Sequence, residues 1–185
     1  MVIDAHVHIP GMDAERYGNY LAPSRRRRIA FRFLMRRFGL TPADLDRAPP
    51  DDAVLAQTLT WLEESRIDHA VFLALDAAYR PDGSRDQENT VIVTANDYVA
   101  DIAAECPRVW FGASIHPYRP DAVDELERLL ERGACLVKWI PGLQNIEPES
   151  SICIPFYKAL ARLRVPLLTH AGIEHVASPF SYTLN

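Results

Sequence analysis

The sequence predicts an α/β protein built on a parallel sheet, and two observations support this fold class. Short apolar runs that are typical of strands alternate along the chain with amphipathic stretches that are typical of helices. One run, Ala70-Val71-Phe72-Leu73-Ala74-Leu75, is continuously apolar, as expected of a strand buried on both faces of a sheet. Repeated strand–helix units imply parallel strands joined by right-handed crossovers. Either a doubly wound open sheet or a (β/α)8 barrel would satisfy this pattern.

The sequence predicts five strands and four helices, beginning with a strand at the N-terminus. The predicted strands are residues 2–8, 70–75, 109–115, 135–139 and 165–170. The predicted helices are residues 51–64, 87–105, 121–132 and 155–164. Asp51 and Asp52 can cap the first of these helices, and Gly133 ends the third. No Gly-x-Gly-x-x-Gly follows a predicted strand, so a dinucleotide-binding fold has no specific support.

An insertion at about residues 11–50 interrupts the strand–helix pattern and contains a basic amphipathic helix. This helix begins at Arg25-Arg26-Arg27-Arg28 and runs to Arg37. It could be a lid over an anionic substrate, a membrane-surface contact or an oligomer contact. The alternative is a solvated helix whose apolar side chains pack on the body of the protein, namely Phe31, Leu34, Met35 and Phe38.

The composition fits a single cytoplasmic domain that spans residues 1–185. The net charge of −5 gives no support to nucleic-acid binding, and no apolar stretch approaches the ~20 residues of a membrane span. The three cysteines are widely spaced and odd in number, which indicates reduced thiols. We therefore expect a small-molecule substrate as partner, and homo-oligomerisation stays open.

His6 and His8 form a His-x-His pair at the end of the first predicted strand. Because side chains alternate along a strand, Asp4, His6 and His8 are expected on one face, opposite Ile3, Ala5 and Val7. Two imidazoles on one face can converge on a transition metal, which they bind at ~2.0–2.1 Å. The alternative is that one histidine packs in the core and the other faces a loop.

Other chemistry-bearing residues fall at the ends of the later predicted strands. In parallel α/β folds, functional sites collect at the carboxyl ends of the strands. The residues at these ends are His6, His8, Asp76, His116, Lys138 and His170. Four of the six histidines are in this set. His69 opens a strand at the opposite end, and His175 follows the last strand. This distribution predicts a metal site.

Three motifs resemble the amidohydrolase superfamily of metal-dependent barrels, in its amidohydrolase-2 branch. They are Asp-Ala-His-Val-His on the first strand, Val-Lys-Trp on the fourth and Pro-Leu-Leu-Thr-His-Ala-Gly on the fifth. The resemblance implies a (β/α)8 TIM-barrel type of fold with about the first five strand–helix units present. It also implies that His6, His8 and His170 bind a divalent metal, with zinc as the first candidate.

Two further residues have open roles under this resemblance. Lys138 matches a lysine that is carboxylated and bridges two metals in binuclear members, or it pairs with a carboxylate at the mouth of the fold. His116 matches an element that is more plausible as a substrate contact than as a ligand. His175 is expected on a solvent-exposed loop.

The resemblance implies a hydrolase of amides or lactones that acts through a metal-bound hydroxide. A decarboxylase similar to aminocarboxymuconate-semialdehyde decarboxylase is the alternative, and both use the same ligands. A metal-binding chain without activity, or an α/β binding module with coincidental histidines, also stays open.

The resemblance covers the whole chain but only the first part of the family fold. The family pattern has eight strands, with a general-base aspartate on the last, so we expect that aspartate beyond residue 185. The chain is expected to be an N-terminal portion of a longer protein, with a half-barrel closed by dimerisation as the alternative.

Overall fold

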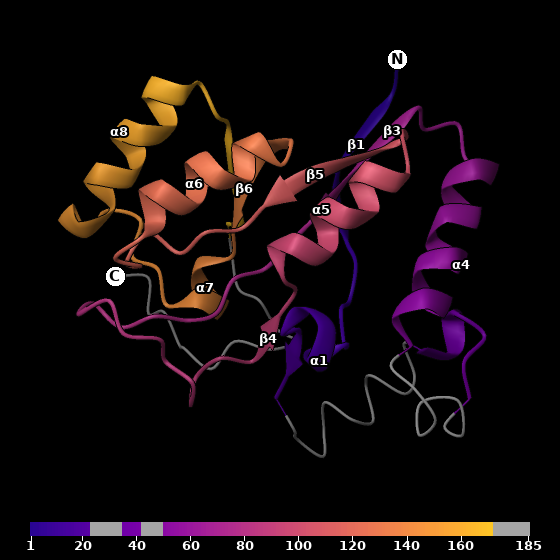
Figure 1. Cartoon of the computed structure of the whole chain (residues 1–185), viewed down its shortest axis with the longest axis horizontal. Helices are drawn as coiled ribbons and strands as arrows, with labels where there is room; N and C mark the ends of the chain where they lie inside the picture. Colours follow the sequence, from indigo (N-terminus) through magenta and orange to yellow (C-terminus); the bar gives the residue numbers. More distant parts are fainter. Residues whose placement is uncertain (23–34, 42–49, 172–185) are drawn as a thin grey trace.

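Five parallel strands form one curled sheet in the computed structural model, which describes residues 1–22, 35–41 and 50–171 (Figure 1). The strands of this sheet are β1 (Ile3–His8), β3 (His69–Leu73), β5 (Val109–Ala113), β6 (Ala134–Trp139) and β7 (Leu167–Thr169). They lie in the order β1-β3-β5-β6-β7, and every neighbouring pair is parallel. Each new strand is therefore added at the same edge of the sheet.

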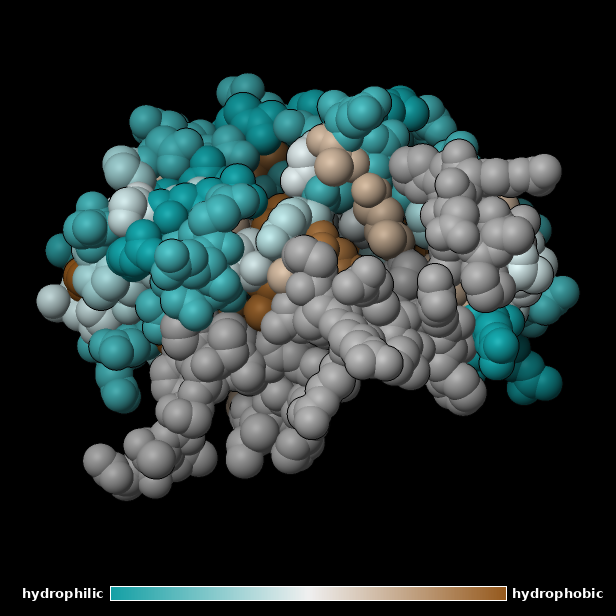
Figure 2. All heavy atoms as spheres, turned by 90° about the horizontal axis from the view of Figure 1, so that it is seen from below, coloured by the Kyte–Doolittle hydropathy of each residue, from teal (hydrophilic) through white to brown (hydrophobic). Residues whose placement is uncertain are grey.

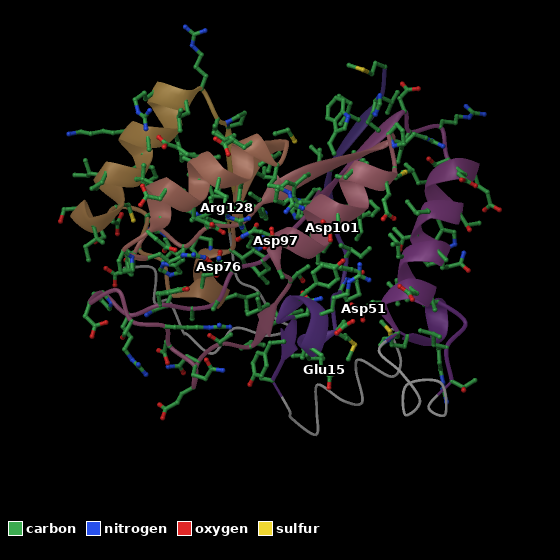
Figure 3. All side chains as sticks on the ribbon, viewed as in Figure 1. Glu15, Asp51, Asp76, Asp97, Asp101 and Arg128 are labelled. Atoms are coloured by element: carbon green, nitrogen blue, oxygen red, sulfur yellow. The ribbon has the colours of Figure 1, made fainter. Side chains whose placement is uncertain are left out.

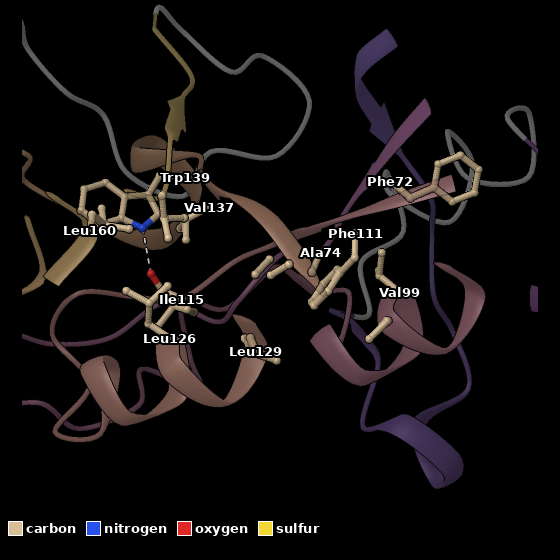
Figure 4. Packing of buried hydrophobic residues seen from close by; sticks show 14 of the residues in the cluster. Phe72, Ala74, Val99, Phe111, Ile115, Leu126, Leu129, Val137, Trp139 and Leu160 are labelled. Carbon is tan, nitrogen blue, oxygen red and sulfur yellow. Dashed lines mark hydrogen bonds between the residues drawn. The ribbon is translucent and has the colours of Figure 1, made fainter. Parts of the chain in front are cut away.

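Four long helices connect these strands and pack on one side of the sheet (Figures 1 and 4). They are α4 (Asp51–Glu64), α5 (Asn96–Glu105), α6 (Ala122–Glu131) and α8 (Ile154–Leu163). A doubly wound sheet would reverse its strand order at a switch point and carry helices on both sides. This sheet does not reverse, so the architecture is the first part of a (β/α)8 barrel, as predicted.

Alternate residues of each strand face opposite sides of the sheet. On the helix side, Phe72, Phe111 and Trp139 are buried in the main core, where the Trp139 Nε1 donates to the Ile115 carbonyl at 2.7 Å (Figure 4). On the opposite side a smaller cluster is formed by Val71, Leu73 and Leu136, with Trp110 and Leu168 packed against it. This second side is the interior side of a barrel, which explains why β3 is apolar at each position from Ala70 to Leu73.

Ion pairs join the exposed edges of α5 and α6 (Figure 3). Arg128 lies 3.0 Å from Asp97, and Arg132 lies 2.7 Å from Asp101. Surface pairs of this kind contribute about 0–1 kcal/mol each, so apolar packing dominates the stability of the helix layer.

The predicted helix 87–105 is wrong in its first half. α5 begins at Asn96, and the preceding Ile92–Val93 forms β4, which pairs antiparallel with β2 (Tyr20–Leu21) in the insertion. Three consecutive β-branched residues, Val91 to Val93, favour a strand, and a partner in the insertion was not visible from sequence.

The N-terminus of α4 also differs from the prediction. Asp51 does not cap the helix; its Oδ1 accepts hydrogen bonds from the backbone N–H groups of Met12 and Asp13 at 2.8 and 3.2 Å. Asp51 therefore ties the loop after β1 to the start of α4. Short elements that were not predicted are α1 (Ala14–Tyr17), α7 (Pro141–Gln144) and the 3-10 helix η1 (Ser151–Cys153).

Most of the predicted basic helix, including Phe31 and Leu34, lies outside the described residues. In its described part, Met35 is fully buried and the Phe38 ring lies 5.1 Å from the Trp61 ring, so these two side chains pack on the body as one alternative predicted. The three cysteines are free. Within the described ranges, no helix has the length and apolar character needed to span a membrane.

Neighbouring leucines of α6 test the orientation of the helix layer. Leu129 is fully buried against the sheet, whereas Leu130 is only partly buried. We expect Leu129→Ala to lower the free energy of unfolding by about 2–5 kcal/mol, because it leaves a cavity in the core. Leu130→Ala should lower the free energy of unfolding, measured by urea denaturation, by clearly less than Leu129→Ala does. Equal losses would contradict this packing.

Candidate functional site

The carboxyl ends of the strands meet at one rim of the sheet. α1, β4 and α7 follow β1, β3 and β6 in the chain and lie together at the lower side of the molecule in Figure 1. Seen from that side, a small area of apolar surface is visible near the centre of the face, next to polar surface (Figure 2).

His6 and His8 meet at this rim through their ring nitrogens. The two Nε2 atoms are 3.1 Å apart, and the rings are 5.0 Å apart at their centroids in an edge-on arrangement. Two imidazoles that share one ion at ~2.0–2.1 Å have their nitrogens about 2.9–3.4 Å apart, from right-angled to tetrahedral geometry. The pair thus has the spacing of two ligands of one metal ion.

A β-bulge in β1 changes which residues share a side with this pair. Asp4 is in register with Ala70, and Val7 with Phe72, so three steps along β1 match two steps along β3. Ala70, Phe72 and Val7 all belong to the helix-side core. The register therefore assigns Asp4 to the helix side, and the prediction that it shares a face with the two histidines is wrong.

His8 lies beyond the bulge on the interior side, in register with Leu73. His6 is on the same side, because its ring meets that of His8. A strict two-residue alternation could not foresee an extra residue within the strand.

Lys138 points to the same interior side from the middle of the sheet. It is in register with Leu168 of the interior cluster, and its side chain is fully buried. The Nζ atom has no hydrogen-bond partner, so the prediction that it pairs with a carboxylate at the mouth is not met by the described residues. Burial lowers the pKa of Lys138.

His170 continues the ladder at the end of β7, where its backbone N–H donates to the Trp139 carbonyl at 2.9 Å. It lies close enough to the His6–His8 pair for its charge to lower the pKa of both rings. Within residues 1–22, 35–41 and 50–171, however, no three His, Cys, Asp or Glu side chains are arranged to hold an ion. The structure brings two predicted ligands into metal-binding range and places the third nearby.

His175 lies outside the described residues.

The electrostatics of the pair favour uncharged rings. Loss of water around the His8 ring, followed by repulsion from His6, Lys138 and His170, lowers the pKa of His8 to about 4. The pKa of His6 is lowered as well, first by desolvation and then by Lys138 and His170. Neutral imidazole is the form that binds metal, so both rings are in the ligand form at neutral pH.

His116 is fully buried and held by two hydrogen bonds. Its Nδ1 accepts from the Tyr118 N–H at 3.1 Å, so the protonated Nε2 donates to the Gln144 carbonyl at 2.7 Å. Burial lowers the pKa of His116 to about 4. A substrate contact, as the sequence predicted, would have to replace one of these bonds, and that role stays a prediction.

Sequence reasoning missed the polar network around His116. Arg119 binds both oxygens of Asp121 at 2.8 and 2.9 Å and reaches Asp76 at 3.2 Å, and the Asp76 carboxylate also accepts from the His116 N–H at 2.9 Å. The fully buried Gln144 links α7 to Ile140 and Ser114. These contacts join the loops after β3, β5 and β6. Only the Arg119–Asp121 spacing could have suggested any of them from sequence.

The family model described as Amidohydrolase matches residues 3–184 of the chain. No curated protein matches the chain closely enough to count as a relative. The sequence match therefore extends over nearly every residue, including the motifs on β1, β6 and β7.

Two solved structures share the fold of the chain. A probable 2-pyrone-4,6-dicarboxylic acid hydrolase from Acinetobacter baumannii, with citric acid bound, has a TM-score of 0.52 and 16% identity; the match covers 92% of this chain and 49% of that protein. A protein named amidohydrolase II has a TM-score of 0.53 and 18% identity; the match covers 100% of this chain and 54% of that protein. The chain thus spans about half the length of these proteins.

The buried state of His116 predicts a loss of stability in acid. Its pKa in the folded protein, about 4, lies below the ordinary value of 6.5, so protons bind preferentially to the unfolded chain. The free energy of unfolding should fall as the pH drops from 6.5 to 4. His116 alone should account for about 3 kcal/mol of this loss. An NMR titration of the His116 ring should give a midpoint near 4; a midpoint near 6.5 would contradict the buried neutral state.

Proposed function

The chain belongs to the amidohydrolase family, and we propose that it carries the first half of the active site of a metal-dependent hydrolase. The bonds proposed for cleavage are the C–N or C–O bonds of amides or lactones. The observation that supports this proposal is the His6–His8 pair, with Nε2 atoms 3.1 Å apart on the interior side of a parallel half-barrel.

The residues at the rim fit a divalent ion, for which zinc is the first candidate. His6 and His8 would hold it, and His170 at the end of β7 is the proposed third ligand. Such an ion polarises a carbonyl oxygen and activates water when it is bound. The general-base aspartate is expected beyond residue 185, so the described residues supply binding and orientation rather than the full catalytic set.

Lys138 would give the site a preference for anionic groups. Its buried ammonium has no hydrogen-bond partner among the described residues, and its charge acts on both His6 and His8. A carboxylate of the substrate would offset this charge. Carboxylation of Lys138 itself, followed by bridging of two metals, is the second way in which the same charge would be removed.

The unpartnered Lys138 also favours a second candidate function, metal-dependent decarboxylation. A decarboxylase must hold a substrate carboxylate, and a buried cation beside the histidine pair suits that task. Release of CO2 from a carboxylated substrate, with no hydrolysed product, would distinguish this reaction from hydrolysis. A metal-binding chain without activity would show neither product.

Metal binding tests the first proposal directly. We expect the chain to bind about one equivalent of Co²⁺ or Zn²⁺ per molecule and to lose at least tenfold in affinity in His6→Ala and His8→Ala, as measured by isothermal titration calorimetry. His69→Ala is the matched control, because His69 opens β3 at the opposite end of the sheet. A wild-type chain that binds no ion would show that the metal proposal is wrong.

Removal of the Lys138 charge should stabilise the metal-free protein. Lys138→Met keeps the length of the side chain but removes a buried ammonium that has no hydrogen-bond partner in the described part of the chain, so we expect the free energy of unfolding to rise by about 1 kcal/mol or more in the presence of a chelator. Lys158→Met, at an exposed position of α8, should change it by less than about 0.5 kcal/mol. A clear loss of stability in Lys138→Met would indicate a partner for this ammonium.

A further inference from the structure

We propose that Asp4 is a positioning residue, whose carboxylate holds the β-bulge of β1 and so directs His6 and His8 toward one ion. The Asp4 Oδ1 accepts a hydrogen bond from the backbone N–H of His6 at 3.0 Å. This inference rests on the metal site proposed above. It assigns Asp4 a task through the backbone rather than as a ligand.

The hydrogen bond has the form of an Asx turn, in which a side-chain oxygen accepts from the N–H two residues later. A bulge leaves its extra residue without a partner in the ladder, and the three-to-two register mismatch places that residue between Asp4 and Val7. The Asp4 carboxylate therefore offers an acceptor at the point where the ladder is interrupted. Two independent features, the register and the contact, coincide there.

The bulge decides which side of the sheet the histidines occupy. In a regular strand, residues four apart share a side, so Asp4 and His8 would lie together. Here Asp4 is in register with the helix-side Ala70, whereas His8 is in register with the interior Leu73. Without the extra residue, a β1 anchored at Asp4 would direct His8 to the helix side, because a one-residue slip exchanges the two sides.

A role as a charged ligand does not fit the position of Asp4. Its register places it on the side of the sheet opposite to Lys138 and His8. What Asp4 supplies is an acceptor oxygen on a short side chain. Asparagine has the same length and the same acceptor, whereas glutamate has the charge but is one methylene longer.

The first experiment measures hydrogen exchange of the His6 amide by NMR in the metal-free chain. We expect Asp4→Asn to leave the exchange rate within about threefold of wild type, and Asp4→Glu and Asp4→Ala to accelerate it at least tenfold. Equal rates in all four proteins would overturn the proposal. This measurement does not depend on metal binding, and the Asn and Glu variants keep it decisive if Asp4→Ala does not fold.

The second experiment measures Co²⁺ affinity and the visible spectrum of the Co²⁺-loaded chain. Asp4→Asn should bind Co²⁺ within about threefold of wild type with the same spectrum, and Asp4→Glu should bind about 10–100-fold more weakly, the usual cost of losing a residue that orients a ligand. The opposite order, in which Asp4→Glu keeps its Co²⁺ affinity and Asp4→Asn loses it, would show that the negative charge is what matters. That result would overturn the proposal.

Asp82 provides the matched control. Its Oδ1 accepts from the Ser84 N–H at 2.9 Å, which is the same two-residue contact in an exposed loop outside β1. Asp82→Glu should accelerate exchange at Ser84 and leave Co²⁺ affinity unchanged. A wild-type chain that does not bind Co²⁺ would contradict the proposed metal function, while the exchange rates would still decide whether Asp4 holds the bulge.

Discussion

The handedness of the strand connections is the constraint on which this structure depends. Because parallel crossovers are right-handed and each strand is added at the same edge, the connecting helices all pack on one side of the sheet. The other side is left for the interior of a barrel. The same constraint brings every strand end to one rim, so residues up to 164 positions apart, such as His6 and His170, belong to one region.

Two kinds of histidine occur at that rim, and their hydrogen bonds distinguish them. Both ring nitrogens of His116 are used within the protein, where they join the loops after β5 and β6. His6 and His8 instead present their Nε2 atoms to each other. The Asp76–Arg119–His116 network joins the loops, whereas the His6–His8 pair and Lys138, which has no hydrogen-bond partner among the described residues, form the candidate binding site.

The candidate site is divided between the two outer strands of the sheet. His6 and His8 come from β1 and His170 follows β7, while Lys138 lies between them on β6. Curvature of the sheet brings these strands near enough for the charges of Lys138 and His170 to act on both rings of the pair. The chain spans about half the length of the two similar structures, and its described residues do not group three His, Cys, Asp or Glu side chains around one ion.

The strand–helix order and the residues at the strand ends were determined by sequence alone, because apolar periodicity and turn residues report on local structure. The motifs on the first, fourth and fifth predicted strands also identified the family. Tertiary structure decided what depends on distant partners. β4 exists because Ile92–Val93 pairs with Tyr20–Leu21, and Asp4 lies opposite to the histidines because the register with β3 admits one extra residue. Side-chain alternation is a local rule, whereas a bulge is defined only by the neighbouring strand.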